Sequence, residues 1–167
     1  MNYIYDEVLK LKKKHDTNNP FEIMEQEGII LRHCSGFTKL KGYYCLSNGF
    51  RYAGVNVNLD EQMQKIVAGH ELGHDILHRH IAQAGPMHDV LLYSSASKTA
   101  KEANEFSANL LISDDDVLDQ LGNNYSYFEL SNLLSYPLEI IQFKLNSMRQ
   151  RGFKLNLCDM PDSQFLK

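Results

Sequence analysis

The stretch "GHELGHDILHRH", residues 69–80, places four histidines and a glutamate within twelve residues. It continues an apolar pattern with helical spacing, which predicts a single helix beginning near Asp60. Either Asp60 caps this helix, or Asn58 and Glu61 form a capping box. The buried stripe of the helix then runs through Met63, Ile66, Val67, His70, His74 and Leu77.

His70 and His74 therefore lie one turn apart on the buried face, with Glu71 beside them, in the pattern H-E-x-x-H. Two imidazoles at i and i+4 can reach one ion in tetrahedral geometry, and the glutamate projects toward a bound water. Imidazole ligands suit the borderline-soft Zn²⁺. The pattern predicts one zinc ion held by His70 and His74, with Glu71 as general base. The alternative is a chance match in which the histidines are merely packed.

A third ligand has three candidates, two of them on the same helix. His78 extends the i, i+4 series but lies about 12 Å along the helix axis from His70, too far for one ion to serve both. His80 stands where the last histidine of H-E-x-x-H-x-x-G-x-x-H would stand. In that pattern a glycine turns the chain back toward the metal, whereas Leu77 occupies its position here and favours a continuing helix.

The third candidate is Glu102, in "KTAKEANEFSANLLI", a predicted helix from about Lys98 to Ile112. Glu102 borders the apolar stripe of this helix, whereas Glu105 shares a face with Lys98 and Lys101. A carboxylate on the core side of a following helix can complete a His₂Glu site, so we expect Glu102 to be the third ligand. The alternative is an ordinary surface ion pair between Glu102 and Lys98.

The rest of the chain predicts an α+β fold: a small, mostly antiparallel sheet packed on the zinc-binding helix pair. Two helices come first, and Asn19 and Pro20 begin the second. Three strands follow, with "SNG" at 47–49 as a hairpin turn, and only helices are expected after Asp60. The strands are "IILRHC", "KGYYCLSNG" and "FRYAGVNVNL". We divide the chain into a metallopeptidase core, residues 1–112, and a helical subdomain, residues 113–167, packed as one compact unit.

Residues 128–148, "FELSNLLSYPLEIIQFKLNSM", have the outline of a helix-turn-helix. One interpretation is DNA contact; the other is that these helices pack as a lid and a substrate-docking surface. The net charge of −4 and the apolar run "LEII" favour packing and argue against direct nucleic-acid binding. The residues that would contact DNA are Gln142, Lys144, Arg149 and Arg151.

Length and composition indicate one soluble domain. The chain has 167 residues, of which 43% are hydrophobic and 23% charged, as in ordinary globular proteins. Its three cysteines are odd in number and widely spaced, which favours free thiols in a reducing cytoplasm. We expect neither a signal peptide nor a membrane span.

"HELGHDILH" followed by "KEANEFSANLLI" resembles the ImmA/IrrE family of metallopeptidases, the M78 group, over about residues 15–112. The resemblance implies zinc at His70, His74 and Glu102, and Glu71 as the catalytic base. Two positions depart from the family pattern. Ala100 stands where many relatives carry an acidic residue, which removes a rival ligand, and Ser107 stands where alanine is usual.

The resemblance also implies a zinc endopeptidase whose protein substrate is a helix-turn-helix repressor of a prophage or integrative element, so that cleavage releases repressed genes. The alternatives are a regulatory module that binds the repressor without cutting it, and a DNA-binding regulator. The strand "YAGVNVN" could bind the substrate backbone as an added strand. The group that stabilises the oxyanion could be Tyr43, Tyr44, His88 or Tyr93. Their spacing in the sequence does not select one of them.

Overall fold

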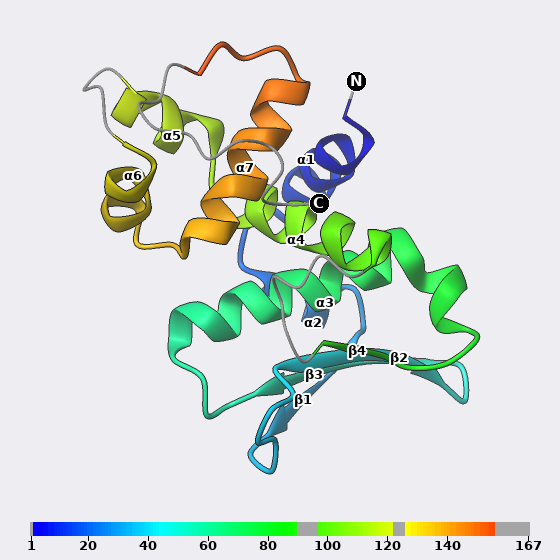
Figure 1. Cartoon of the computed structure of the whole chain (residues 1–167). Helices are drawn as coiled ribbons and strands as arrows, with labels where there is room; N and C mark the ends of the chain where they lie inside the picture. Colours follow the sequence, from blue (N-terminus) through cyan, green and yellow to red (C-terminus); the bar gives the residue numbers. More distant parts are fainter. Residues whose placement is uncertain (1, 90–96, 122–125, 156–167) are drawn as a thin grey trace.

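A computed structural model describes residues 2–89, 97–121 and 126–155, leaving out the side chains of residues 88, 89 and 121. Helices and a small sheet form separate layers (Figure 1). The helices are α1 Tyr3–His15, α2 Pro20–Gln26, α3 Glu61–Ala82, α4 Lys98–Leu111, α5 Asp114–Leu121, α6 Tyr127–Leu134 and α7 Leu138–Gln150. The strands are β1 Ile30–Cys34, β2 Gly42–Ser47, β3 Phe50–Asn56 and β4 Met87–Asp89. The predicted α+β class is confirmed.

Side-chain caps begin the helices where the sequence places them. Asp60 begins α3, because its side chain accepts a hydrogen bond from the Met63 amide at 2.7 Å, and this decides between the two expected caps. Asn19 caps α2, with Pro20 in the first turn. Ser97 caps α4, which covers nearly the range predicted for it.

The sheet has the order β1-β3-β2-β4 and is mixed. β2 pairs antiparallel with both β3 and β4, whereas β1 pairs parallel with β3. The hairpin at residues 47–49 is confirmed: Asn48 and Gly49 have φ of 51° and 81°, the left-handed pair that a tight I′-type turn requires. The expectation of only helices after Asp60 is wrong, because β4 forms there. A strand of three residues has no readable periodicity and depends on its pairing with β2.

The topology also excludes β3 as an edge for an added substrate strand. β3 lies between β1 and β2, so both of its edges are already hydrogen-bonded. Within the described strands, the outer positions belong to β1 and β4.

Small residues let α4 approach α3 closely, above the sheet (Figure 1). A Cβ added at Gly69 would lie 2.6 Å from the Ser107 Oγ, and one at Gly73 would lie 3.2 Å from the Ala103 Cα. A later residue of α3 therefore meets an earlier residue of α4. The two helices run antiparallel. This approach brings the polar side chains of α4 within reach of the α3 histidines.

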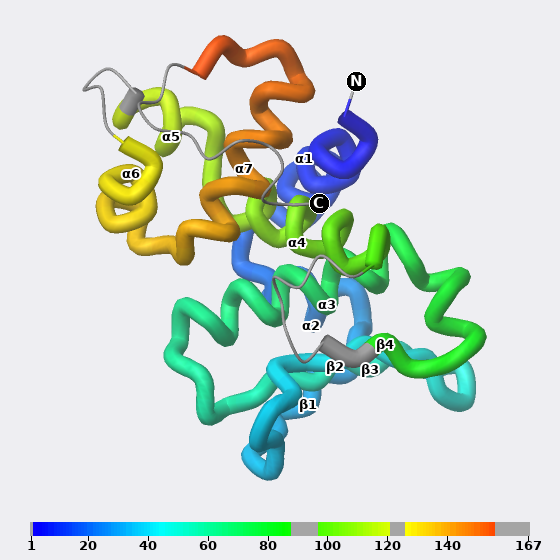
Figure 2. The backbone as a smooth tube through the Cα atoms, viewed as in Figure 1, coloured from blue at the N-terminus to red at the C-terminus, as the bar shows by residue number. Residues whose placement is uncertain are grey.

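Helices α1 and α7 pack on α4 on the side away from the sheet (Figure 2). The predicted helices of the C-terminal segment are present as α5, α6 and α7. α7 is buried on most of its surface, including Ile140, Ile141, Leu145 and Met148. No helix in the described ranges is long and apolar enough to cross a bilayer.

Candidate functional site

Helix α3 places His70, Glu71, His74 and His78 in the interior, all at most 3% exposed. The Nε2 atoms of His70 and His74 lie 3.1 Å apart, with the two rings nearly perpendicular. Two imidazole nitrogens bound to one zinc at about 2.0–2.1 Å in tetrahedral geometry would stand roughly 3.3 Å apart. The spacing of these two nitrogens therefore fits a shared ion.

A chain of hydrogen bonds fixes which ring nitrogens carry protons. The Asn104 Oδ1 is 2.8 Å from the His70 Nδ1, and this amide oxygen can only accept. The Glu102 Oε2 likewise accepts from the His78 Nε2 at 2.9 Å. In a neutral His78 the Nδ1 then carries a lone pair, so it accepts from the His74 Nδ1 at 3.1 Å.

With protons on their Nδ1 atoms, His70 and His74 each carry a lone pair on Nε2, which is a form in which imidazole binds zinc. Hydrogen bonds to the other ring nitrogens are what zinc-binding histidines ordinarily make, because they hold the ring and its tautomer. The donor chemistry therefore fits a zinc ion at His70 and His74.

The structure brings Glu102 to His78, and its carboxylate is also 3.7 Å from the Lys98 Nζ. Burial lowers the pKa of His78, and the neighbouring Glu102 acts in the opposite direction. Within the described ranges, no group of three or more His, Cys, Asp or Glu side chains is arranged as a set of metal ligands. The predicted His₂Glu site of His70, His74 and Glu102 thus stays a prediction.

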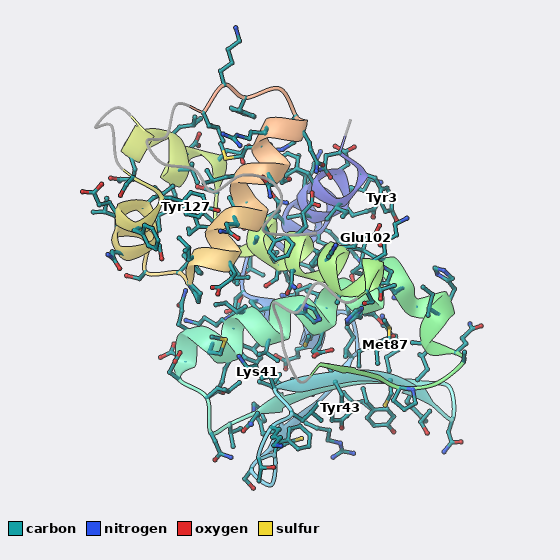
Figure 3. All side chains as sticks on the ribbon, in the orientation of Figure 1. Tyr3, Lys41, Tyr43, Met87, Glu102 and Tyr127 are labelled. Carbon is teal, nitrogen blue, oxygen red and sulfur yellow. The ribbon has the colours of Figure 1, made fainter. Side chains whose placement is uncertain are left out.

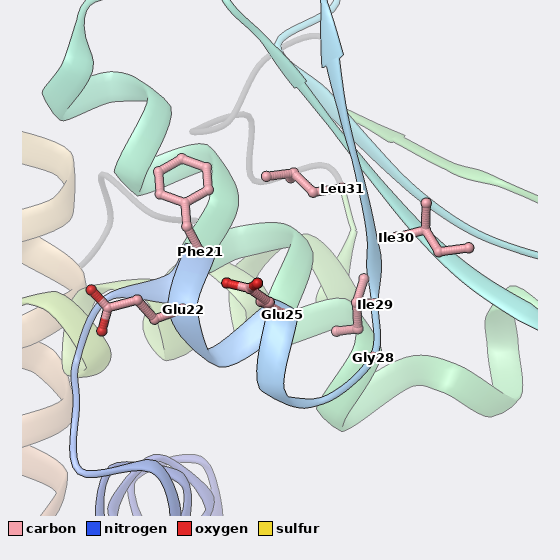
Figure 4. Close-up of a pocket in the computed structure, with 7 residues that line it drawn as sticks. All are labelled: Phe21, Glu22, Glu25, Gly28, Ile29, Ile30 and Leu31. Atoms are coloured by element: carbon pink, nitrogen blue, oxygen red, sulfur yellow. The ribbon is translucent and has the colours of Figure 1, made fainter.

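His80 is exposed, on a helix that continues through Leu77 to Ala82 as the sequence analysis expects. His78, His80 and Glu102 all line a surface pocket of about 250 Å³ (Figure 3 labels Glu102 and Tyr3 on its wall). A larger pocket, of about 440 Å³, lies between α2 and β1 and contains none of the predicted site residues (Figure 4). Of the predicted site residues, Glu102 lines the smaller of these two pockets, whereas His70, Glu71 and His74 do not.

Sequence reasoning missed Asp75, which is fully buried one turn after Glu71. Its carboxylate accepts hydrogen bonds from the Tyr44 hydroxyl at 2.6 Å, from Arg51 at 2.8 Å and from Arg79 at 2.7 Å. Two arginines and a phenol compensate the burial of this charge. A signal was present in the sequence, because Asp75 and Arg79 stand at i and i+4 on the predicted helix.

The same contacts reduce the candidates for stabilising an oxyanion. The Tyr44 hydroxyl is bonded to Asp75 inside the core, and burial raises the pKa of Tyr44 strongly, so its proton is not available to a substrate. Tyr43 is half-buried at the preceding position of β2, and burial also raises its pKa. The His88 side chain and Tyr93 lie outside the described residues.

The four residues considered for DNA contact do not form an exposed row on α7. Gln142 and Lys144 are 5% and 1% exposed. The Lys144 Nζ is 2.7 Å from the Asp114 carboxylate, and Arg151 donates two hydrogen bonds to the same carboxylate at 2.6 and 2.7 Å. Arg149 is the exposed member of the four. This burial supports the packing interpretation of the C-terminal helices.

Comparison with known proteins gives a family and a relative. Residues 24–146 match the family model Peptidase_M78, described as an IrrE N-terminal-like domain. The chain is also 28% identical over 137 residues to "Uncharacterized immunity region protein 2" of Bacillus phage phi105, which covers 82% of this chain and 85% of the relative. No solved structure matches the chain.

Proposed function

Since the chain belongs to the Peptidase_M78 family, we propose that it is a zinc-dependent endopeptidase that hydrolyses a peptide bond in a protein substrate. Membership of the family suggests a metallopeptidase. We propose in addition that the metal is zinc, which residues bind it and act in catalysis, and what the substrate is. The observation that carries it is the 3.1 Å approach of the His70 and His74 Nε2 atoms in the interior, close to the spacing of two imidazole ligands on one zinc ion.

In this proposal His70 and His74 hold the zinc, and Glu102 is the third ligand. A zinc ion bound there would lower the pKa of a water molecule and polarise the scissile carbonyl. Asn104 orients the His70 ring, and His78 orients the His74 ring, each through an Nδ1 hydrogen bond. Burial of these side chains keeps bulk water away from the reacting groups.

Glu71 is the proposed general base. It lies on α3 between the two histidines and is fully buried. Glu71 would take the proton from the attacking water and pass it to the leaving amine. Removing such a base typically costs 10²–10⁴-fold in rate.

We propose a helix-turn-helix repressor of a prophage or integrative element as the substrate, acting in the cytoplasm. Support comes from the phage phi105 relative, whose name refers to an immunity region. Cleavage would release the genes that the repressor controls. A repressor encoded beside this chain is the substrate to test first.

The experiment compares wild type with Glu71→Gln, which keeps the size of the side chain but cannot accept the proton at neutral pH. Both proteins should bind one zinc and the repressor, and mass spectrometry should find a new N-terminus with wild type alone. If both relieve repression and neither yields a fragment, the protein acts by binding and the peptidase proposal is wrong.

The ligand assignment has its own test, because Glu102 is bonded to His78 in this structure. Glu102→Ala should lower zinc affinity far more than His78→Ala, with Glu105→Ala as the control on the same helix. Equal losses for Glu102→Ala and His78→Ala would mean that Glu102 acts only through His78. Loss of zinc in His80→Ala, with zinc kept in Glu102→Ala, would instead make His80 the third ligand.

A further inference from the structure

A buried hydrogen bond fixes how α3 lies along β2. The Tyr44 hydroxyl on β2 donates to Asp75 on α3, and both side chains are fully buried. Two residues earlier on the same face of β2 is Gly42, and four residues earlier on α3 is Glu71. Two strand residues span about 6.8 Å and four helical residues about 6 Å, so the second pair meets in the same way as the first.

Gly42 therefore faces the Glu71 carboxylate without a side chain between them. A Cβ added at Gly42 would overlap the Glu71 Oε1 and would lie 2.5 Å from the Val67 Cγ1. The space that an alanine methyl would fill is occupied by the carboxylate proposed as the general base.

The backbone conformation of Gly42 does not explain the glycine. Its φ is not in the left-handed region, unlike that of Gly28, Gly49, Gly85 and Gly152. An alanine at this position would meet no backbone strain, so packing is what obstructs it. The added methyl would meet Glu71 and Val67 of α3 and, at 3.0 Å, the Gly54 carbonyl oxygen of β3.

We propose that Gly42 is a positioning residue for Glu71, kept free of a side chain so that the carboxylate can lie between α3 and β2. This inference rests on the proposed role of Glu71 as general base. A base must stand within hydrogen-bond reach of the proton that it takes, and a misplacement of about 1 Å can cost 10²-fold in rate. Tyr44 and Asp75 hold the register that brings the two residues together.

The first test is kinetic, with the protein substrate that wild type cleaves. Gly42→Ala should bind one zinc per chain and keep KM within about twofold, because neither the metal ligands nor the docking surface changes. Its kcat should fall at least about tenfold, because the base is displaced. An unchanged kcat, or a loss confined to KM, would overturn the proposal.

The second test needs neither zinc nor activity, so it separates this inference from the proposed function. In chelator, the melting temperature is measured for Gly42→Ala in wild type and in a Glu71→Ala background. In the Glu71→Ala background, Gly42→Ala should lower the melting temperature by at least about 3 °C less than it does in wild type. This difference measures the coupling between the two sites. Equal losses in melting temperature in the two backgrounds would show that the two sites do not interact, which would overturn the proposal.

Gly69→Ala is the matched control for this cycle. Its added methyl meets the Ser107 side chain on α4 and not Glu71, so its loss should be the same in both backgrounds. If Gly42→Ala fails to fold in wild type, folding of Gly42→Ala with Glu71→Ala supports the proposal. Failure of both to fold would overturn it.

Discussion

Helix α4 carries two buried asparagines that serve different regions of the molecule. Asn104 faces α3 and accepts a hydrogen bond from His70. Asn109 faces α7, where it accepts from Lys144 and donates to Ser147. Both side chains are 1% exposed, yet one belongs to the histidine cluster and the other to a cluster of charges.

The two clusters differ in the partners of their buried polar groups. In the charge cluster, the Asp114 carboxylate receives Arg151 in two hydrogen bonds, Lys144 and the Tyr5 hydroxyl. In the histidine cluster, the Nε2 atoms of His70 and His74 lie 3.1 Å apart. The first arrangement is complete within the chain and stabilises the fold. The second brings two imidazole nitrogens to nearly the spacing that two ligands of one zinc ion take, which is the basis of the proposed metal site.

The largest effect should come from removing residues 113–167, which we propose to be part of the same folded unit as residues 1–112. Helix α7 buries Ile140, Ile141, Leu145 and Met148, each worth about 1.5–3 kcal/mol, and their sum is comparable to the net stability of a domain. The fragment 1–112 should therefore aggregate or unfold in size-exclusion chromatography. A soluble fragment with a sharp melting transition would show two separate domains.

The next largest effect should come from opening the charge cluster. Asp114→Ala leaves Lys144 with its charge buried and uncompensated, which typically costs about 3–5 kcal/mol. Urea unfolding should show this loss, whereas Asp115→Ala, at an exposed neighbouring position, should change stability by less than about 0.5 kcal/mol. Zinc affinity should be unchanged in the folded variant. A loss of zinc would contradict the separation of the two clusters.

Asn104→Ala should act on the metal rather than on the charge cluster. Loss of the hydrogen bond to the His70 Nδ1 should weaken zinc binding by about 10–100-fold in competition with a chelator. Asn109→Ala, the buried asparagine on the other side of the same helix, is the control and should bind zinc as wild type does. Equal affinity in the two variants would mean that Asn104 does not support the metal site.

The smallest effect should be the acid dependence of stability. Burial opposes ionisation of Asp114, but hydrogen bonds from Arg151 and Lys144 outweigh it and hold the pKa of Asp114 well below its usual 3.8. Below that value the unfolded chain binds a proton that the folded chain does not, so stability falls as pH falls. The slope is at most about 1.4 kcal/mol per pH unit for one proton. Asp114→Asn should reduce this slope in urea unfolding between pH 4 and about 2.5, and an unchanged slope would exclude Asp114 as its source.

Lys144 shows why the sequence could not separate these roles. In the sequence it stands among basic residues of a predicted helix-turn-helix, where an exposed lysine would contact phosphate. In the structure it is buried, and burial lowers its pKa to about 8 although Asp114 acts in the opposite direction. Nothing within one helical turn of Lys144 reveals Asp114, which lies on a different helix.

The sequence by itself determined α3 and its start near Asp60, the face that carries His70 and His74, and the hairpin turn at residues 47–49. These features depend on bonds and periodicity within a few residues, so the order of side chains is enough to predict them. Only the tertiary structure decided the parallel pairing of β1 with β3, the strand β4, the contact of Glu102 with His78, and the meeting of Gly42 with Glu71. These depend on which distant segments pack together, a choice made by the summed free energy of many contacts that no local pattern records.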